Sequence, residues 1–110
     1  MSKRDIGLYL QDIISSIQKI QKYSRGLSFD EFIKDGKTAD AVIRNLEIIG
    51  EAACHIPESF QEDCGGIPWR QMKSMRHKVV HEYFGVDLEI LWKTIKEDLP
   101  ELKKKIKKIL

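Results

Sequence analysis

Apolar residues recur at steps of three and four along almost the whole chain of 110 residues. This spacing places them on one face of an α-helix, whereas a half-buried β-strand needs strict alternation, which no stretch keeps for long. The first apolar stripe, over residues 4–24, consists of Ile6, Leu10, Ile13, Ile17 and Ile20. The second, over residues 38–56, consists of Val42, Leu46, Ile49 and Ala53. The periodicity therefore predicts an all-α protein.

The last apolar stripe keeps its phase on both sides of Pro100. Its members are Leu88, Leu91, Ile95, Leu99, Leu102, Ile106 and Ile109. Because the phase is not lost at the proline, we predict one kinked helix here, with Asp87 as its N-cap, and not two unrelated helices.

Shorter helices and one further long helix complete the predicted architecture. Ser28 and Glu31 have the spacing of a capping box, which predicts a short helix through Lys34 that Gly36 ends. A second short helix is expected over residues 57–64. Pro68 fits the first turn of a helix over residues 69–83. The expected fold is an up-and-down helical bundle of four main helices with one or two short ones.

Chain length and charge bound the class of protein. A chain of 12.8 kDa is expected to form one domain over residues 1–110, because a second core would not fit. Its 19 basic and 17 acidic residues give a net charge of +2, which excludes a histone-like tail but allows a local basic patch. The first twenty residues carry charges where a signal peptide needs an apolar core, and no apolar run approaches the roughly 20 residues of a membrane span. We expect a cytoplasmic protein without membrane contact.

The chemically unusual segment is residues 70–84, RQMKSMRHKVVHEYF. It holds four cations, two of the three histidines, one tyrosine and one acid, so its formal charge is +3 before either histidine is protonated. Such a segment suits a polyanion such as RNA, although a solvated helix face would have the same charge.

Metal binding is an alternative for the two histidines of this segment. His77 and His81 lie four residues apart, which is the spacing of metal ligands on one helix face. No third ligand is evident, and the neighbouring Arg76 and Lys78 repel a cation. Cys54 and Cys64 form no CxxC pair, which argues against a four-ligand zinc site and a disulfide framework. We therefore expect no metal and no cofactor.

Arg76, His81 and Tyr83 supply side chains suited to phosphodiester cleavage. An imidazole can take a proton from a ribose 2′-hydroxyl or return one to the leaving oxygen, and a guanidinium can hold the charge of the phosphorane. On an unbroken helix Tyr83 lies about 20° and His81 about 140° from Arg76. The three side chains converge only if the helix loosens near Val80 or if two chains pool their residues. Taken singly, they also fit a surface ion pair, a core histidine and a helix-end aromatic residue.

The string Arg76-x4-His81-x-Tyr83 is similar to the R-x4-H-x-Y motif of the HEPN superfamily, specifically the HepT toxin family of HepT/MntA toxin–antitoxin pairs. Residues 37–53 (KTADAVIRNLEIIGEAA) resemble the family's second-helix signature. Residues 67–92 (IPWRQMKSMRHKVVHEYFGVDLEILW) and 97–100 (EDLP) resemble later segments in the same order. His77 follows the motif arginine where the family commonly has Asn or another small polar residue.

The resemblance implies a HEPN-like fold and a homodimeric, metal-independent endoribonuclease whose cleft is built from the motifs of both chains. It implies that Arg76 and His81 are catalytic. We expect His77 to support them, because histidine is polar and can donate a hydrogen bond. Tyr83 would accept AMP from ATP through a small MntA-like nucleotidyltransferase antitoxin, which thereby inhibits the enzyme. The expected partners are RNA, this transferase and a second copy of the chain, and neither DNA nor a membrane.

Three residues of the second-helix signature, Arg44, Glu47 and Glu51, would line or brace the cleft. Their helix-neighbour spacings fit a structural salt-bridge ladder equally well. The superfamily also includes non-catalytic modules that bind nucleotide or the transferase partner, and a bundle that merely dimerises is a third possibility. The presence of an imidazole beside an arginine favours the ribonuclease, because a pure binder does not need that pair. We expect the homodimer interface to include residues 69–83.

Overall fold

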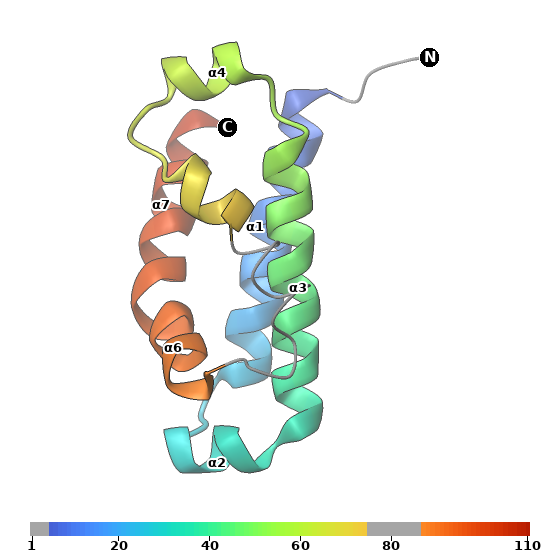
Figure 1. Cartoon of the computed structure of the whole chain (residues 1–110), viewed down its shortest axis with the longest axis vertical. Coiled ribbons are helices and arrows are strands. Elements are labelled where there is room, and N and C mark those ends of the chain that lie inside the picture. Colours follow the sequence, from blue (N-terminus) through green and yellow to red (C-terminus); the bar gives the residue numbers. More distant parts are fainter. Residues whose placement is uncertain (1–4, 75–86) are drawn as a thin grey trace.

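The computed structural model describes residues 5–74 and 87–110. Two long helices, α1 (Ile6–Ser24) and α3 (Gly36–Cys54), lie side by side, and the last helix, α7 (Leu99–Ile109), packs against α1. In Figure 1, α1 runs in one direction while α3 and α7 run in the other. The described residues form helices, turns and bends without a β-strand, which confirms the prediction of an all-α bundle.

The core is formed by the apolar stripes of the three longest segments. Their fully buried members include Ile13, Ile17 and Ile20 from α1, Val42 and Ile49 from α3, and Leu99 and Ile106 from α7. Among the residues that the structure describes, no helix combines the length and the apolar character that a membrane span requires.

A local hydrogen-bond pattern begins the short helix α2 (Phe29–Lys34), which lies at the end of the bundle opposite α4 (Figure 1). The N–H of Glu31 donates to Oγ of Ser28 at 3.2 Å, and the N–H of Ser28 donates to Oε1 of Glu31 at 3.0 Å. The capping box is therefore confirmed. Two hydrogen bonds with Ser28 lower the pKa of Glu31, because they stabilise its charged form. The bond from the backbone N–H has the larger effect and the bond with the hydroxyl the smaller one.

The predicted end of the short helix at Lys34 is confirmed, but the role of Gly36 differs from the prediction. Gly36 does not end the short helix, since it is the first residue of α3. The residue between the helices is Asp35, whose carboxylate accepts from Oγ1 of Thr38 at 2.6 Å and from the N–H of Thr38 at 3.0 Å. Both hydrogen bonds lower the pKa of Asp35, and the bond from the hydroxyl has the larger effect. Because this carboxylate caps α3 at once, the chain re-enters a helix two residues earlier than its apolar stripe indicates.

The prolines mark the next segments. After α3 the chain passes Pro57 and forms α4 (Glu58–Asp63), and residues 69–74 are helical after Pro68. The indole N–H of Trp69 donates to the carbonyl oxygen of Cys64 at 3.1 Å, which ties this helix to the end of α4.

The C-terminal segment is continuous but not uniform. Helix α6 (Leu88–Lys93) begins at Asp87, whose carboxylate accepts from the N–H of Glu89, and continues into a π-helical turn, η2 (Thr94–Asp98), and then into α7. The N–H of Leu99 donates to the carbonyl oxygen of Thr94, five residues earlier. Pro100 has no N–H, and its ring would clash with the carbonyl of a normal helical turn, so the wider turn accommodates it. The predicted continuity across Pro100 is confirmed, with a π-helical turn at the irregularity.

Two glycines that flank α2, Gly26 after α1 and Gly36 at the start of α3, provide a matched test of backbone conformation. Gly26 has φ of +79°, and a Cβ added to either Gly26 or Gly36 would meet no heavy atom within 4 Å. Gly26→Ala is expected to lower the free energy of unfolding by about 1–2 kcal/mol, because an L-residue is strained in this left-handed region. Gly36→Ala, at the start of α3, is expected to leave stability unchanged or to raise it by less than about 1 kcal/mol.

Thermal denaturation followed by circular dichroism measures both effects. A loss of 1 kcal/mol corresponds to a fall in Tm of roughly 4 °C or more for a domain of this size. Equal melting temperatures for the two variants would show that the turn at Gly26 tolerates a side chain.

Candidate functional site

The four motif residues singled out in the sequence, Arg76, His77, His81 and Tyr83, lie outside the described residues. Their roles stay predictions. The structure does describe the three supporting residues of α3 and the start of the basic segment, residues 70–74.

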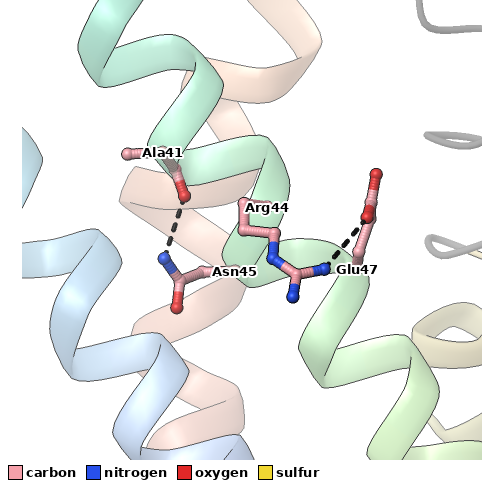
Figure 2. A network of polar contacts seen from close by, with 4 residues as sticks. All are labelled: Ala41, Arg44, Asn45 and Glu47. Atoms are coloured by element: carbon pink, nitrogen blue, oxygen red, sulfur yellow. Dashed lines mark hydrogen bonds and ion pairs between the residues drawn. The ribbon is translucent and has the colours of Figure 1, made fainter.

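Arg44 and Glu47 lie one helical turn apart on α3. Nη1 of Arg44 is 3.7 Å from Oε2 of Glu47, and the Arg44 side chain remains 71% exposed (Figure 2). An exposed ion pair of this kind contributes about 0–1 kcal/mol to stability, so the fold does not depend on it. The guanidinium keeps most of its donors on the surface, where they could meet an anionic group.

Glu51, one turn further along α3, forms a second polar pair. Its Oε1 lies 3.3 Å from Nε2 of His55, and both side chains are about half exposed. The ring of His55 stacks on the ring of Tyr9 from α1, with 5.3 Å between the centroids and 11° between the planes. The carboxylate and the stacked ring together fix the orientation of this imidazole.

His55 was missed by the sequence reasoning, which concentrated on the two histidines of the basic segment. A signal was present, because Glu51 and His55 have the (i, i+4) spacing of helix neighbours. The stacking on Tyr9 had no such signal, since it depends on how α1 and α3 pack. Of the expected ladder, the step from Arg44 to Glu47 is present, and Glu51 contacts His55.

Asn45 projects from α3 in a different direction from Arg44 (Figure 2). Its side chain is buried, and Nδ2 donates to the carbonyl oxygen of Ala41 at 2.9 Å. Oδ1 is buried and has no hydrogen-bond partner among the residues that the structure describes. A buried acceptor left in this state costs free energy, so α3 carries a polar group that its own packing does not satisfy.

Hydrogen bonds through Gln61 link the start of the basic segment to the chain just after α3. Nζ of Lys73 donates to Oε1 of Gln61 at 2.9 Å, and Nε2 of Gln61 donates to the carbonyl oxygen of Ile56 at 2.8 Å. Trp69 and Met72 are buried in the core. The exposed residues of this segment within the described range are Arg70, Gln71 and Ser74.

A candidate metal centre is not found in the described part of the chain. Over residues 5–74 and 87–110, no three His, Cys, Asp or Glu side chains are placed to share one ion. Cys54 and Cys64 are both free thiols.

Comparison with known proteins places these features in a family. A family model described as "Ribonuclease HepT-like" matches residues 13–109. A protein of Thermococcus cleftensis named "Probable ribonuclease HepT" is 50% identical over 107 residues, which cover 97% of each chain. A protein of Methanocaldococcus jannaschii named as a "Putative RNase" is 42% identical over 106 residues, which cover 96% of this chain and 97% of that one. A protein of Caldanaerobacter subterraneus, also named as a "Putative RNase", is 42% identical over 102 residues, which cover 93% of this chain and 91% of that one. No solved structure matches this chain.

Proposed function

We propose, from the fact that the chain belongs to the HepT-like ribonuclease family, that it is an endoribonuclease that cuts RNA without a metal ion. The observation that carries the proposal is the family match over residues 13–109, which includes the complete Arg76-x4-His81-x-Tyr83 string. Similarity to relatives named as ribonucleases over nearly their whole length supports the same activity.

The proposed reaction is an in-line transesterification. An imidazole of His81 takes the proton of a ribose 2′-hydroxyl, and the freed oxygen attacks the adjacent phosphorus. The bond from phosphorus to the 5′ oxygen breaks, and that oxygen receives a proton as it leaves. Arg76 donates paired hydrogen bonds to the non-bridging oxygens, whose charge rises in the phosphorane. The products are a 2′,3′-cyclic phosphate and a 5′-hydroxyl.

The reaction gives a reason for a homodimer. In-line displacement needs a base and an acid on opposite sides of the phosphate, and one chain carries one copy of the Arg76–His81 pair. A two-fold interface would supply both from identical residues. The exposed polar side chains of α3, Arg44, Glu47 and Glu51, would then line or brace the shared groove.

We further propose that the chain is the toxin of a pair in which a minimal nucleotidyltransferase is the antitoxin. The hydroxyl oxygen of Tyr83 would attack the α-phosphorus of ATP, so that AMP is transferred and pyrophosphate leaves. The support for this step is the position of Tyr83 in the motif string, two residues after His81.

The test uses a labelled single-stranded RNA and a DNA of the same sequence, each incubated with the purified protein in EDTA. We expect cleavage of the RNA alone, products that end in a 2′,3′-cyclic phosphate, and a dimer by light scattering of the same sample. RNA binding without cleavage would favour the non-catalytic module. Cleavage that EDTA stops and zinc restores would favour a metal site at His77 and His81. A monomer that cleaves RNA would contradict the shared groove.

A further inference from the structure

A shallow hollow of about 340 Å³ lies where the end of α1 meets the π-helical turn and the start of α7. One wall is formed by residues of the segment 21–26, and the other by Ile95, Lys96 and Pro100. The two walls come from opposite ends of the sequence. The hollow exists because α1 packs against α7 and because the wider turn of η2 precedes Pro100.

The lining residues that the structure describes carry charge of one sign. Arg25 and Lys96 contribute two exposed cations, and no carboxylate lies among the lining residues within 5–74 and 87–110. Gln21 adds an amide whose Oε1 accepts from Nζ of Lys103 at 3.2 Å. The nitrogen of this amide carries two N–H donors. The lining therefore offers donors and positive charge, which is what a phosphate oxygen needs.

Lys96 is held in place by an aromatic ring. Its Nζ lies 4.5 Å from the centroid of the Trp92 ring, and Trp92 in turn packs on the fully buried Phe32 with 5.0 Å between the ring centroids. A cation held over a ring keeps its N–H groups available on the other sides while losing part of its conformational freedom. Less entropy is then lost when the ammonium binds an anion.

A second hollow, of about 320 Å³, shows what distinguishes the first. It lies between residues 68–72 and the segment 97–105. Its described lining residues include three carboxylates, those of Glu97, Asp98 and Glu101, and one cation, Lys105. The neighbouring residues Lys96 and Glu97 thus place opposite charges in the two hollows. Since the whole chain carries a net charge of only +2, a polyanion would be guided by this local difference and not by the overall charge.

We propose that the basic hollow, defined by Gln21, Arg25 and Lys96, binds a phosphate of the RNA backbone. The inference rests on the proposed function, in that RNA is taken as the substrate. Among the residues described here, the lining includes no aromatic ring on which a nucleobase could stack. A backbone phosphate requires neither a ring nor a base-reading group, and such contacts position a nucleic acid without reading its sequence. These residues lie outside the R-x4-H-x-Y motif and extend the RNA contact to α1 and η2.

The test measures the affinity of full-length protein for a 2′-O-methyl RNA, which cannot be cleaved, by fluorescence anisotropy over a series of salt concentrations. Arg25→Gln and Lys96→Gln are each expected to weaken binding about threefold to tenfold at low salt. Each should also reduce the slope of log affinity against log salt by about 0.7, the value for one lost phosphate contact on a single strand.

Lys19→Gln is the matched control. It removes one positive charge from the same helix, but Lys19 lies about 160° around α1 from Gln21, on the other side of the helix. Its slope and its affinity should equal those of the wild type. Thermal melts of all three variants exclude unfolding as the cause of a change.

The possible outcomes separate this inference from the proposed function. If the wild type binds and cleaves RNA while Arg25→Gln and Lys96→Gln keep its salt slope, the basic hollow does not contact the backbone and the inference alone fails. An equal loss in Lys19→Gln would also overturn it, because the effect would then be one of total charge. If the wild type neither binds nor cleaves RNA, the proposed function fails first.

Discussion

Replacement of His81 or Arg76 by alanine is expected to reduce RNA cleavage by a factor of about 10² to 10⁴ while the helical circular dichroism stays that of the wild type. The imidazole of His81 moves the proton in the proposed reaction, and general acid–base catalysis by one positioned side chain contributes a factor of this size. The guanidinium of Arg76 stabilises charge that develops only in the transition state, and removal of one such donor has a comparable cost. Initial rates on a labelled RNA, measured at saturating and at low substrate, give the loss in kcat and in kcat/KM separately.

Two further variants make the arginine result specific. Arg76→Lys keeps the charge but not the planar fork that can donate two parallel hydrogen bonds, so it should recover only part of the lost activity. Arg70→Ala removes an exposed arginine six positions earlier in the same basic segment and should keep cleavage within a few-fold of the wild type. A loss in Arg70→Ala as large as that in Arg76→Ala would show that the segment acts through its total charge.

Two results for His81→Ala would contradict a catalytic role of His81. If His81→Ala lost its helical signal, the side chain would be a core residue and the cleavage defect would say nothing about catalysis. Full activity in a folded His81→Ala variant would remove this imidazole from the mechanism.

Tyr83→Phe is expected to lose all modification by AMP and to remain toxic when a minimal nucleotidyltransferase partner is co-expressed. The variant lacks the oxygen that would attack the α-phosphorus of ATP, so no adduct can form at this position. Intact-mass spectrometry after incubation with the transferase, ATP and magnesium should show one or more added AMP units on the wild type and none on Tyr83→Phe.

The inhibition has a physical reason. An AMP group adds a phosphodiester with about one negative charge at neutral pH. This phosphate could accept the charge-assisted hydrogen bonds that Arg76 would otherwise donate to the RNA, and its charge would repel the RNA backbone. Modified wild type should therefore lose cleavage in proportion to the fraction that carries AMP.

Tyr23 provides a matched control for the acceptor. It lies on α1, its side chain is exposed, and it is not part of the motif. Tyr23→Phe should gain as much AMP as the wild type does. An adduct that persists in Tyr83→Phe and disappears in Tyr23→Phe would move the acceptor to α1 and remove Tyr83 from the control mechanism.

Local features were predicted from the sequence where the interacting groups lie within one helical turn. The capping box of Ser28 and Glu31 is such a case, because its two hydrogen bonds join residues three apart. The role predicted for Gly36 was wrong for a related reason, since Asp35 and Gly36 are adjacent and each is a common residue at a helix end. The hydrogen bonds from Thr38 to Asp35 decide between them, and a pattern of residue types does not contain those distances.

The sequence predicted an irregular helix near Pro100 but did not predict that the irregularity is a π-helical turn. A proline without an N–H guarantees that a helical hydrogen bond is missing. Whether the backbone bends, breaks or widens depends on what the flanking residues pack against. Here Ile95 and Leu99 are both buried, so a π-helical turn keeps the apolar side chains on both sides of Pro100 in the core.

The all-α class and the apolar faces of α1, α3 and α7 were predictable from the residue pattern. Both depend on residues a few positions apart, and helix geometry converts that spacing directly into a shared face. Which polar groups meet across helices depends instead on how the helices pack. Tyr9 stacks on His55, Lys103 donates to Gln21 from 82 residues away, and Arg25 shares a hollow with Lys96. Several packings would bury the same apolar stripes, and the relative rotation of α1, α3 and α7 within one of them sets which surface residues become neighbours.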